Sequence, residues 1–300
     1  MNQVDVETFL MLVKTENITK TAQNLFVSQP TVSHRLKLLE DELGVPLLIR
    51  KKGHKRLELT PKGEEFVPIA ERWLALMDET RMLKSKSDLL YLSVGCTDTL
   101  NATIFKGLYR KILQDENIPL HLNISTHYSY VLYENVQNYL VDAGFVYHYL
   151  HFKNIVAEPV LHEKMYLVQE AGGAIRKEKL YLREMNPDSE VYFTWETNFQ
   201  AWHEQMISGG NRASLEVDTF SLLSEFLKDR GKWTIAPRSV VDELSKIQNI
   251  YVSQIADRRQ PPERVTYMIM RSDVSESRKK AIALFRAQMR NYFRELGYEE

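Results

Sequence analysis

The stretch that decides the fold is residues 17–50, which read NITKTAQNLFVSQPTVSHRLKLLEDELGVPLLIR. Apolar residues recur here at three- and four-residue spacing in two groups, which predicts two short helices joined by a tight turn. Three residues of the first helix, at about 18–25, are expected to be buried: Ala22, Leu25 and Phe26. The second helix should begin at Ser28, whose hydroxyl can accept from unpaired N–H groups of the first turn, and end at Gly44.

The second helix has a polar amino-terminal half, and its acidic residues are confined to the other half. A recognition helix needs this polarity, because amide, hydroxyl and guanidinium groups read base edges in the major groove whereas carboxylates would face phosphates. The residues of this helix that we predict to bind DNA are Ser28, Gln29, Thr31, Ser33, His34, Arg35 and Lys37.

A basic turn follows at residues 50–56, RKKGHKR, before the strand-like alternation of 57–59. Cations around a glycine turn are typical of a wing that lies against a phosphate backbone or in a minor groove. The net charge of the whole chain is only −1, so this basic character is local. The wing residues predicted to bind DNA are Arg50, Lys51, Lys52, Lys55 and Arg56.

In order and spacing, this part of the chain resembles the LysR-type transcriptional regulators. The resemblance implies a winged helix–turn–helix domain; the alternative is an αα-hairpin used only for packing. Thr21 and the pair 48–49 depart from the residues usual in the family. The matching residues are Thr19, Ala22, Leu25, Val27, Ser28, Gln29, Pro30, Val32, Ser33, Leu39, Glu40, Leu43, Gly44, Val45, Pro46, Leu47, Arg50, Leu59, Thr60 and Gly63.

A long helix is predicted over residues 60–86, with Thr60 as its cap, Pro61 as its first residue and Glu64 closing a capping box. Its apolar positions follow a four–three spacing, which favours a seam against a partner helix over packing on its own domain. In LysR-type proteins the corresponding helix joins two DNA-binding domains. The seam positions are Phe66, Ala70, Trp73 and Met77, with Val67 and Leu74 alongside.

The first residues of the chain and its composition restrict the fold class and the cellular compartment. Residues 4–16 are predicted to form a first helix with Phe9, Leu10, Leu12 and Val13 inward. The chain has one cysteine, Cys96, which excludes an intrachain disulfide and which we place in a buried strand. There is neither a signal-like N-terminus nor an apolar run long enough to span a membrane, so we expect a cytoplasmic protein.

Beyond a polar hinge at 84–88, short apolar runs alternate with helical segments, which predicts an α/β domain. The predicted strands are 90–96, 120–125, 143–147, Val160, 165–168, 191–193, 215–217, 234–236 and 265–270. The predicted helices are 99–113, 130–140, 198–208, 219–230 and 275–296.

The resemblance extends into this region through Asp142–Phe145, Glu158–Val160, Ile235–Pro237 and Val265–Arg271. It implies two α/β subdomains like those of a periplasmic binding protein, joined by strands that cross near 162–168 and 263–268. The division that we expect is 1–59 for the winged helix–turn–helix domain, 60–88 for the dimerising linker helix and hinge, and 89–300 for the effector-binding domain. Within the last, subdomain I covers about 89–162 and 268–300, and subdomain II about 163–267.

Polar and aromatic residues gather where predicted strands end and helices begin, which is where doubly wound folds bind ligands. Each hydroxyl there could instead be a helix cap. By the resemblance, Thr97, Thr99, Ser129 and Thr194 occupy positions that bind effectors. The predicted effector-binding residues are Thr97, Asp98, Thr99, His127, Ser129, Tyr147, Thr194 and Trp195, and Tyr128 and His148 add to an aromatic cleft.

No nucleophile elbow, dinucleotide fingerprint or phosphate loop is present, so we predict neither an enzyme nor a cofactor. His148 and His151 lack a third ligand at a suitable spacing, so no metal site is predicted. The resemblance implies a transcriptional regulator that binds paired half-sites of double-stranded promoter DNA as a homotetramer made of two dimers, with RNA polymerase as a further partner. A small-molecule effector in the cleft would change DNA binding or bending.

Two rival interpretations come from other classes. The first is a constitutive architectural DNA-binding protein whose cleft is vestigial. The second is an enzyme built on the binding-protein fold, which would need a catalytic constellation that the sequence does not show.

Overall fold

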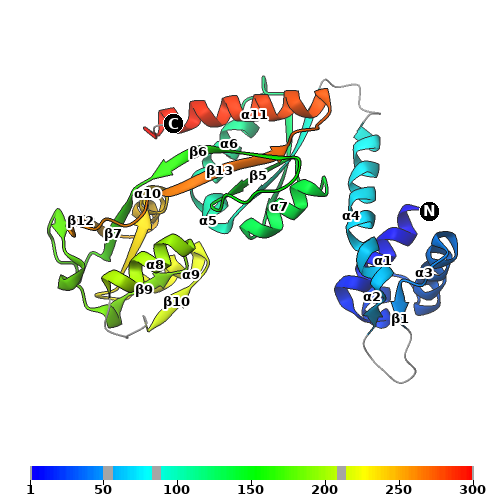
Figure 1. The fold of residues 1–300 in the computed structure, drawn as a ribbon, viewed down its shortest axis with the longest axis horizontal. Coiled ribbons are helices and arrows are strands. Elements are labelled where there is room, and N and C mark those ends of the chain that lie inside the picture. The colour runs from blue at the N-terminus through cyan, green and yellow to red at the C-terminus, as the bar shows by residue number, and fades with distance from the viewer. Residues whose placement is uncertain (1, 50–56, 83–88, 208–213, 299–300) are drawn as a thin grey trace. The chain divides into compact units, whose positions relative to one another are not determined.

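The computed structural model describes residues 2–49, 57–82, 89–207 and 214–298 (Figure 1). The chain forms two compact units, one made almost entirely of residues 1–88 and the other almost entirely of residues 89–300. We call them the N-terminal unit and the C-terminal unit. The basic turn at 50–56 and the hinge at 84–88 both lie outside the described residues.

The N-terminal unit opens with three helices: α1 (Gln3–Thr15), α2 (Ile18–Asn24) and α3 (Gln29–Leu43). The predicted boundaries of α3 are confirmed. Ser28 caps it by accepting a hydrogen bond from the Thr31 N–H, and Gly44 ends it at φ 71°, in the left-handed region that suits glycine.

The core of this unit contains the predicted inward positions of α1 and α3, including Phe9, Leu12, Val32 and Leu39, but of those predicted for α2 it contains only Ala22. The prediction for Phe26 is wrong. Its side chain is 95% exposed and its φ is 55°, because the chain leaves α2 through a left-handed residue that turns the ring outward. The short turn between α2 and α3 therefore overrides the apolar pattern.

Two short strands, β1 (Leu48–Ile49) and β2 (Glu58–Leu59), pair antiparallel on either side of the undescribed wing tip. The helix α4 (Pro61–Met82) follows. Thr60 caps it, since its hydroxyl accepts from the Gly63 N–H at 2.9 Å. The capping box predicted with Glu64 is wrong, because the Thr60 N–H donates to the Leu47 carbonyl and thereby ties the helix to the wing.

The apolar stripe of α4 also differs from its prediction. Phe66 and Ala70 are buried in the core of their own unit, and the Phe66 ring lies 5.3 Å from that of Phe9. These two positions are therefore internal rather than part of a seam for a partner. Among the side chains of α4 that the structure describes, the exposed large apolar ones are Ile69, at 56%, and Leu76, at 46%, seven residues apart on the helix.

The C-terminal unit has two lobes. The first lobe contains a five-stranded sheet in the order β4-β3-β5-β13-β6, in which β3 runs parallel to β4 and β5 while β13 runs antiparallel to β5 and β6. Its strands are β3 (Leu90–Cys96), β4 (Leu120–Thr126), β5 (Ala143–Val146), β6 (Ile155–Glu163) and β13 (Arg264–Arg271).

Helices cover both faces of this sheet (Figure 1). One face packs against α6 (Lys106–Gln114) and α11 (Glu276–Glu295), the other against α7 (Ser129–Gln137). The helix predicted from residue 99 starts as α5 (Asp98–Leu100) and passes through a π-helical segment, η1 (Asn101–Phe105), before α6. Such π segments are frequent at functional sites.

The second lobe contains a sheet in the order β11-β7-β12-β8 and the parallel pair β9–β10. Its strands are β7 (Met165–Glu170), β8 (Lys179–Leu180), β9 (Val191–Phe193), β10 (Leu215–Val217), β11 (Trp233–Pro237) and β12 (Ile250–Ile255). Its helices are α8 (Thr197–Met206), α9 (Phe220–Phe226) and α10 (Arg238–Ile247), with short 3-10 turns η2 (Leu182–Glu184) and η3 (Pro187–Ser189).

The chain passes between the lobes twice. The first passage is the single residue Lys164, between β6 and β7, which agrees with the predicted crossing near 162–168. The second lies between β12 and β13, at residues 256–263. It therefore precedes the predicted 263–268, because Arg264 already pairs with Glu163 in the sheet of the first lobe.

Candidate functional site

The predicted DNA-binding residues of α3 are accessible at its amino-terminal end. Gln29, His34 and Lys37 are exposed, while Thr31, Ser33 and Arg35 are half-buried. The Ser28 hydroxyl caps the helix and lies 2.8 Å from the Thr31 hydroxyl. Arg35 is partly anchored, because its Nη1 donates to the Thr8 hydroxyl at 3.4 Å. The wing residues Arg50, Lys51, Lys52, Lys55 and Arg56 lie outside the described residues.

A cavity of about 760 Å³ lies between the two lobes of the C-terminal unit. The carboxyl ends of β3, β4 and β5 open onto it from the first lobe, and β9 with the segment before α9 opens onto it from the second. This volume is in the range of small-molecule sites. All eight predicted effector residues line the cavity: Thr97, Asp98, Thr99, His127, Ser129, Tyr147, Thr194 and Trp195.

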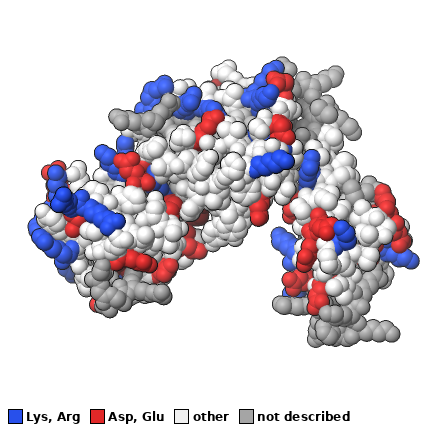
Figure 2. Space-filling view, in the orientation of Figure 1, with Lys and Arg blue, Asp and Glu red and all other residues white. Residues whose placement is uncertain are grey.

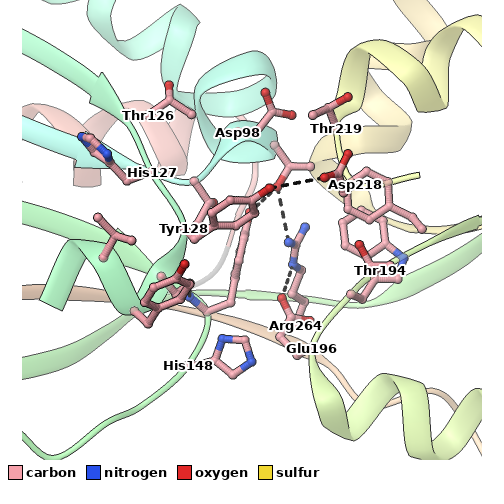
Figure 3. A pocket seen from close by; sticks show the side chains of 18 of the residues that line it. Asp98, Thr126, His127, Tyr128, His148, Thr194, Glu196, Asp218, Thr219 and Arg264 are labelled. Atoms are coloured by element: carbon pink, nitrogen blue, oxygen red, sulfur yellow. Dashed lines mark hydrogen bonds and ion pairs between the residues drawn. The ribbon is translucent and has the colours of Figure 1, made fainter. Parts of the chain in front are cut away.

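Several lining residues, among them Glu196, Asp218 and Arg264, were not predicted from the sequence. Figure 3 shows Arg264 in the middle of the labelled side chains. Its side chain is only 4% exposed. Its Nε donates to Glu196 Oε1 at 2.9 Å and its Nη2 to the Thr99 hydroxyl at 3.3 Å. A lone arginine at the start of an apolar strand, 264–270, was the signal that could have indicated it.

Two aromatic rings pack against the Arg264 guanidinium. Its central carbon lies 3.4 Å from the Tyr147 ring centre and 4.2 Å from that of Trp195. Trp195 is itself fixed, because its Nε1 donates to the Ile235 carbonyl at 2.8 Å and its ring stacks on Phe193. Cation–π contacts of this kind gain strength when they are desolvated. Arg264 is therefore rigidly placed in the cavity.

The hydroxyl groups predicted to bind the effector do not act as helix caps, whereas the Thr219 hydroxyl, which also lines the cavity, caps α9. Thr97 occupies the cap position of α5 but makes no capping hydrogen bond with its side chain. The Ser129 hydroxyl accepts from the Tyr147 N–H at 3.4 Å, and the Thr194 hydroxyl donates to the Val217 carbonyl at 3.4 Å. The Thr99 hydroxyl lies 2.9 Å from that of Tyr147. The capping alternative thus fails for these residues.

Several hydrogen bonds cross the cavity from lobe to lobe. The Phe220 N–H, at the start of α9, donates to Asp98 Oδ2 at 2.7 Å. The Tyr128 hydroxyl donates to Asp218 Oδ2 at 3.3 Å (Figure 3). Away from the cavity, Lys106 of α6 pairs with Glu243 of α10. Polar contacts therefore join the two lobes, and a bound molecule can extend or replace them.

Burial changes the titration of several groups near the cavity. Desolvation raises the pKa of Glu163, which is 1% exposed and accepts from the Ser239 N–H at 2.7 Å, while the Arg264 charge opposes that rise. Burial lowers the pKa of His127, so this side chain favours its neutral form. Burial also raises the pKa of the Cys96 thiol to about 12, which leaves it protonated and unreactive at neutral pH.

Charged side chains elsewhere on the C-terminal unit are mixed. On the face seen in Figure 2, lysines and arginines gather at the outer end of the second lobe, with acidic side chains nearby. No helix within the described ranges is long and apolar enough to cross a membrane.

A winged helix–turn–helix unit followed by a two-lobed α/β unit with a cavity between its lobes defines a DNA-binding regulator with a ligand-binding module. Comparison with known families gives the same result. Residues 4–64 match the bacterial regulatory helix-turn-helix protein, lysR family, and residues 91–294 match the LysR substrate binding domain. The chain belongs to the LysR family of DNA-binding transcriptional regulators.

Relatives align over nearly the whole length. An HTH-type transcriptional regulator in the lacR 5′ region of Staphylococcus xylosus is 23% identical over 92% of this chain and 97% of its own. The structure of full-length CbnR complexed with target DNA has a TM-score of 0.71 at 20% identity, covering 97% of this chain and 100% of that one. A full-length OxyR variant from Pseudomonas aeruginosa has a TM-score of 0.62 at 22% identity, covering 97% and 95%. These structures share the fold.

Proposed function

We propose that a small molecule bound in the cavity between the lobes changes how this regulator binds or bends DNA. The observation that carries the proposal is that both lobes line one cavity and already exchange hydrogen bonds across it, through Asp98, Tyr128 and Arg264. A ligand that prefers one angle between the lobes shifts the population toward that angle. Its differential affinity for the two arrangements sets the size of the response.

On the DNA side, the amino-terminal half of α3 reads base edges in the major groove and the wing binds phosphates. We propose that the chain acts in the cytoplasm, by binding rather than by catalysis, and that its target is double-stranded promoter DNA with paired half-sites. The structure of CbnR with its target DNA supports this assignment by its fold. A homo-oligomer, made of two dimers, brings several recognition helices to one promoter, and RNA polymerase is the further partner.

The first test is ligand-dependent stabilisation of the full-length protein. A panel of carboxylic acids, amines, amino acids, sugars and nucleotides is screened by thermal unfolding, and each stabilising compound is then added to promoter-DNA binding assays. At least one compound should raise the melting temperature and change the affinity for promoter DNA or the DNA bend. If no compound of the panel does so, the constitutive architectural interpretation replaces this one.

Variants then locate the ligand. Thr97→Val and Ser129→Ala should each weaken ligand binding by about 0.5–1.5 kcal/mol, because each removes one hydrogen bond to the ligand. The melting temperature without ligand should stay close to that of the wild type, because neither hydroxyl caps a helix. Ser224→Ala, on α9 and outside the cavity, is the matched control and should leave ligand affinity unchanged. A lowered melting temperature with unchanged ligand affinity would contradict the proposed site.

A further inference from the structure

Resting on the proposed function, we infer that the effector is a zwitterion of the α-amino-acid type, whose carboxylate binds Arg264 and whose ammonium group binds between Asp98 and Asp218. The inference follows from which polar atoms of the cavity lining are already engaged and which are not.

The negative end of the ligand is defined by Arg264. A guanidinium has five N–H donors, and here Nε and Nη2 are engaged with Glu196 and Thr99. Nη1 is buried and has no hydrogen-bond partner among the described residues. A buried cationic N–H without an acceptor is costly, so this atom favours a ligand that brings an oxygen anion.

Stacking adds to this preference. Tyr147 and Trp195 lie against the guanidinium, so its plane keeps one direction. When a planar carboxylate binds a fixed guanidinium, neither group loses much conformational entropy. Arg264 is thus a preorganised binding site for a carboxylate.

The positive end is defined by two carboxylates, Asp98 and Asp218, that line the cavity from opposite lobes. Asp98 accepts from the Phe220 N–H and Asp218 from the Tyr128 hydroxyl, so each uses one oxygen on a neutral donor. Neither pairs with a cation among the residues that the structure describes. Both act on the same phenol, since both raise the pKa of Tyr128.

The charges of the lining favour a zwitterion over a ligand that carries a single charge. The described lining holds three carboxylates, Asp98, Glu196 and Asp218, against the single cation Arg264. A ligand with only a negative charge would enter a cavity with an excess of negative charge, and one with only a positive charge would leave Arg264 Nη1 without an acceptor. A zwitterion satisfies both ends, and about 760 Å³ leaves room for its side chain beside Val131, Leu150 and Phe193.

The experiment uses the full-length protein and isothermal titration calorimetry with each of the twenty L-amino acids. For every amino acid that binds, two matched probes are measured: the same skeleton without the amino group and the same skeleton without the carboxylate. The amino acid should bind at least about 10-fold more tightly than either probe, which corresponds to about 1.4 kcal/mol. Equal binding of the deaminated acid or of the decarboxylated amine would overturn the inference.

A variant separates the two ends without risking the fold. Asp218 is exposed, so Asp218→Asn should keep the protein folded and reduce the preference for the amino acid over its deaminated acid to less than about 3-fold. Glu216→Gln, on the neighbouring β10 and outside the cavity, is the matched control and should retain the full preference. Full preference retained by Asp218→Asn would overturn the ammonium site.

The outcomes also distinguish this inference from the proposed function. If no amino acid binds but a compound of another class stabilises the protein and loses that effect in Thr97→Val, the cavity is a ligand site and the inference about amino acids is wrong. If no compound of the panel acts through the cavity, the proposed function fails together with it.

Discussion

Replacing Arg264 by methionine should destabilise the C-terminal unit by about 3–5 kcal/mol without any ligand. The substitution leaves the Glu196 carboxylate, which is 13% exposed, without its cation. Breaking a buried ion pair in this way costs about 3–5 kcal/mol. The loss of two ring contacts adds about 0.5–2 kcal/mol each. Removing the unpartnered Nη1 offsets this by about 1–3 kcal/mol, since a buried donor without an acceptor disappears.

A double-mutant cycle tests the reasoning more directly than the single variant. Glu196→Gln keeps an acceptor for Arg264 Nε and should cost only about 1 kcal/mol, the net value of a typical hydrogen bond. The double variant, with Arg264→Met and Glu196→Gln, has no unpaired buried charge at this position. It should therefore be more stable than Arg264→Met by about 2 kcal/mol.

The assay is urea unfolding followed by tryptophan fluorescence, because Trp195, Trp202 and Trp233 are all buried in the second lobe. Lys228→Met, which breaks the exposed pair with Glu225, is the control and should change the free energy of unfolding by less than about 1 kcal/mol. An Arg264→Met variant no less stable than this control would refute the reasoning. Strict additivity in the cycle would also refute it.

Three further predictions concern other parts of the chain. Gln29→Ala should weaken binding to promoter DNA by about 1–3 kcal/mol and to random DNA much less, whereas Lys52→Ala should weaken both and flatten the salt dependence; filter-binding titrations measure this. Leu76→Glu should lower the mass in light scattering, because it charges an exposed apolar position of α4, whereas Phe66→Glu should unfold the N-terminal unit. The folded-state pKa of Glu163 is raised, so the folded state binds the proton more tightly and stability should fall as pH rises from the ordinary carboxyl pKa of 4.5 to the raised value. Glu163→Gln should abolish this slope in urea titrations carried out from pH 4.5 upward, and an unchanged slope would contradict it.

Local signals explain the parts of the fold that could be predicted. Ser28 and Gly44 bound α3 through capping chemistry that lies entirely within a few residues. The strands 90–96, 191–193 and 215–217 match their predicted limits, because apolar alternation between polar turns is also local. The strand β12 (Ile250–Ile255) was not predicted, since only its pairing with β7 distinguishes it from a loop.

The part of the candidate site that lies at the ends of strands could be predicted from the sequence. Thr97 and Ser129 follow predicted strands and Tyr147 ends one, and the parallel arrangement brings such positions together. Arg264 depends on contacts with residues far away in the chain, Thr99 and Glu196, and no local pattern records them. The burial of Phe66 in its own unit could not be predicted for a similar reason. An apolar stripe on α4 can pack equally well against a partner helix or against its own domain.

The insertion of the second lobe between β6 and β13 has a consequence for synthesis on the ribosome. Arg264 pairs with Glu163 across about one hundred residues, so β13 emerges only after the whole second lobe has been made. Until then β5, whose four residues are all buried in the finished protein, is the bare edge of the sheet β4-β3-β5. An apolar edge strand is a template for pairing with another chain. In the nascent first lobe, the apolar strand 143–146 therefore stays without its second partner until β13 has been made.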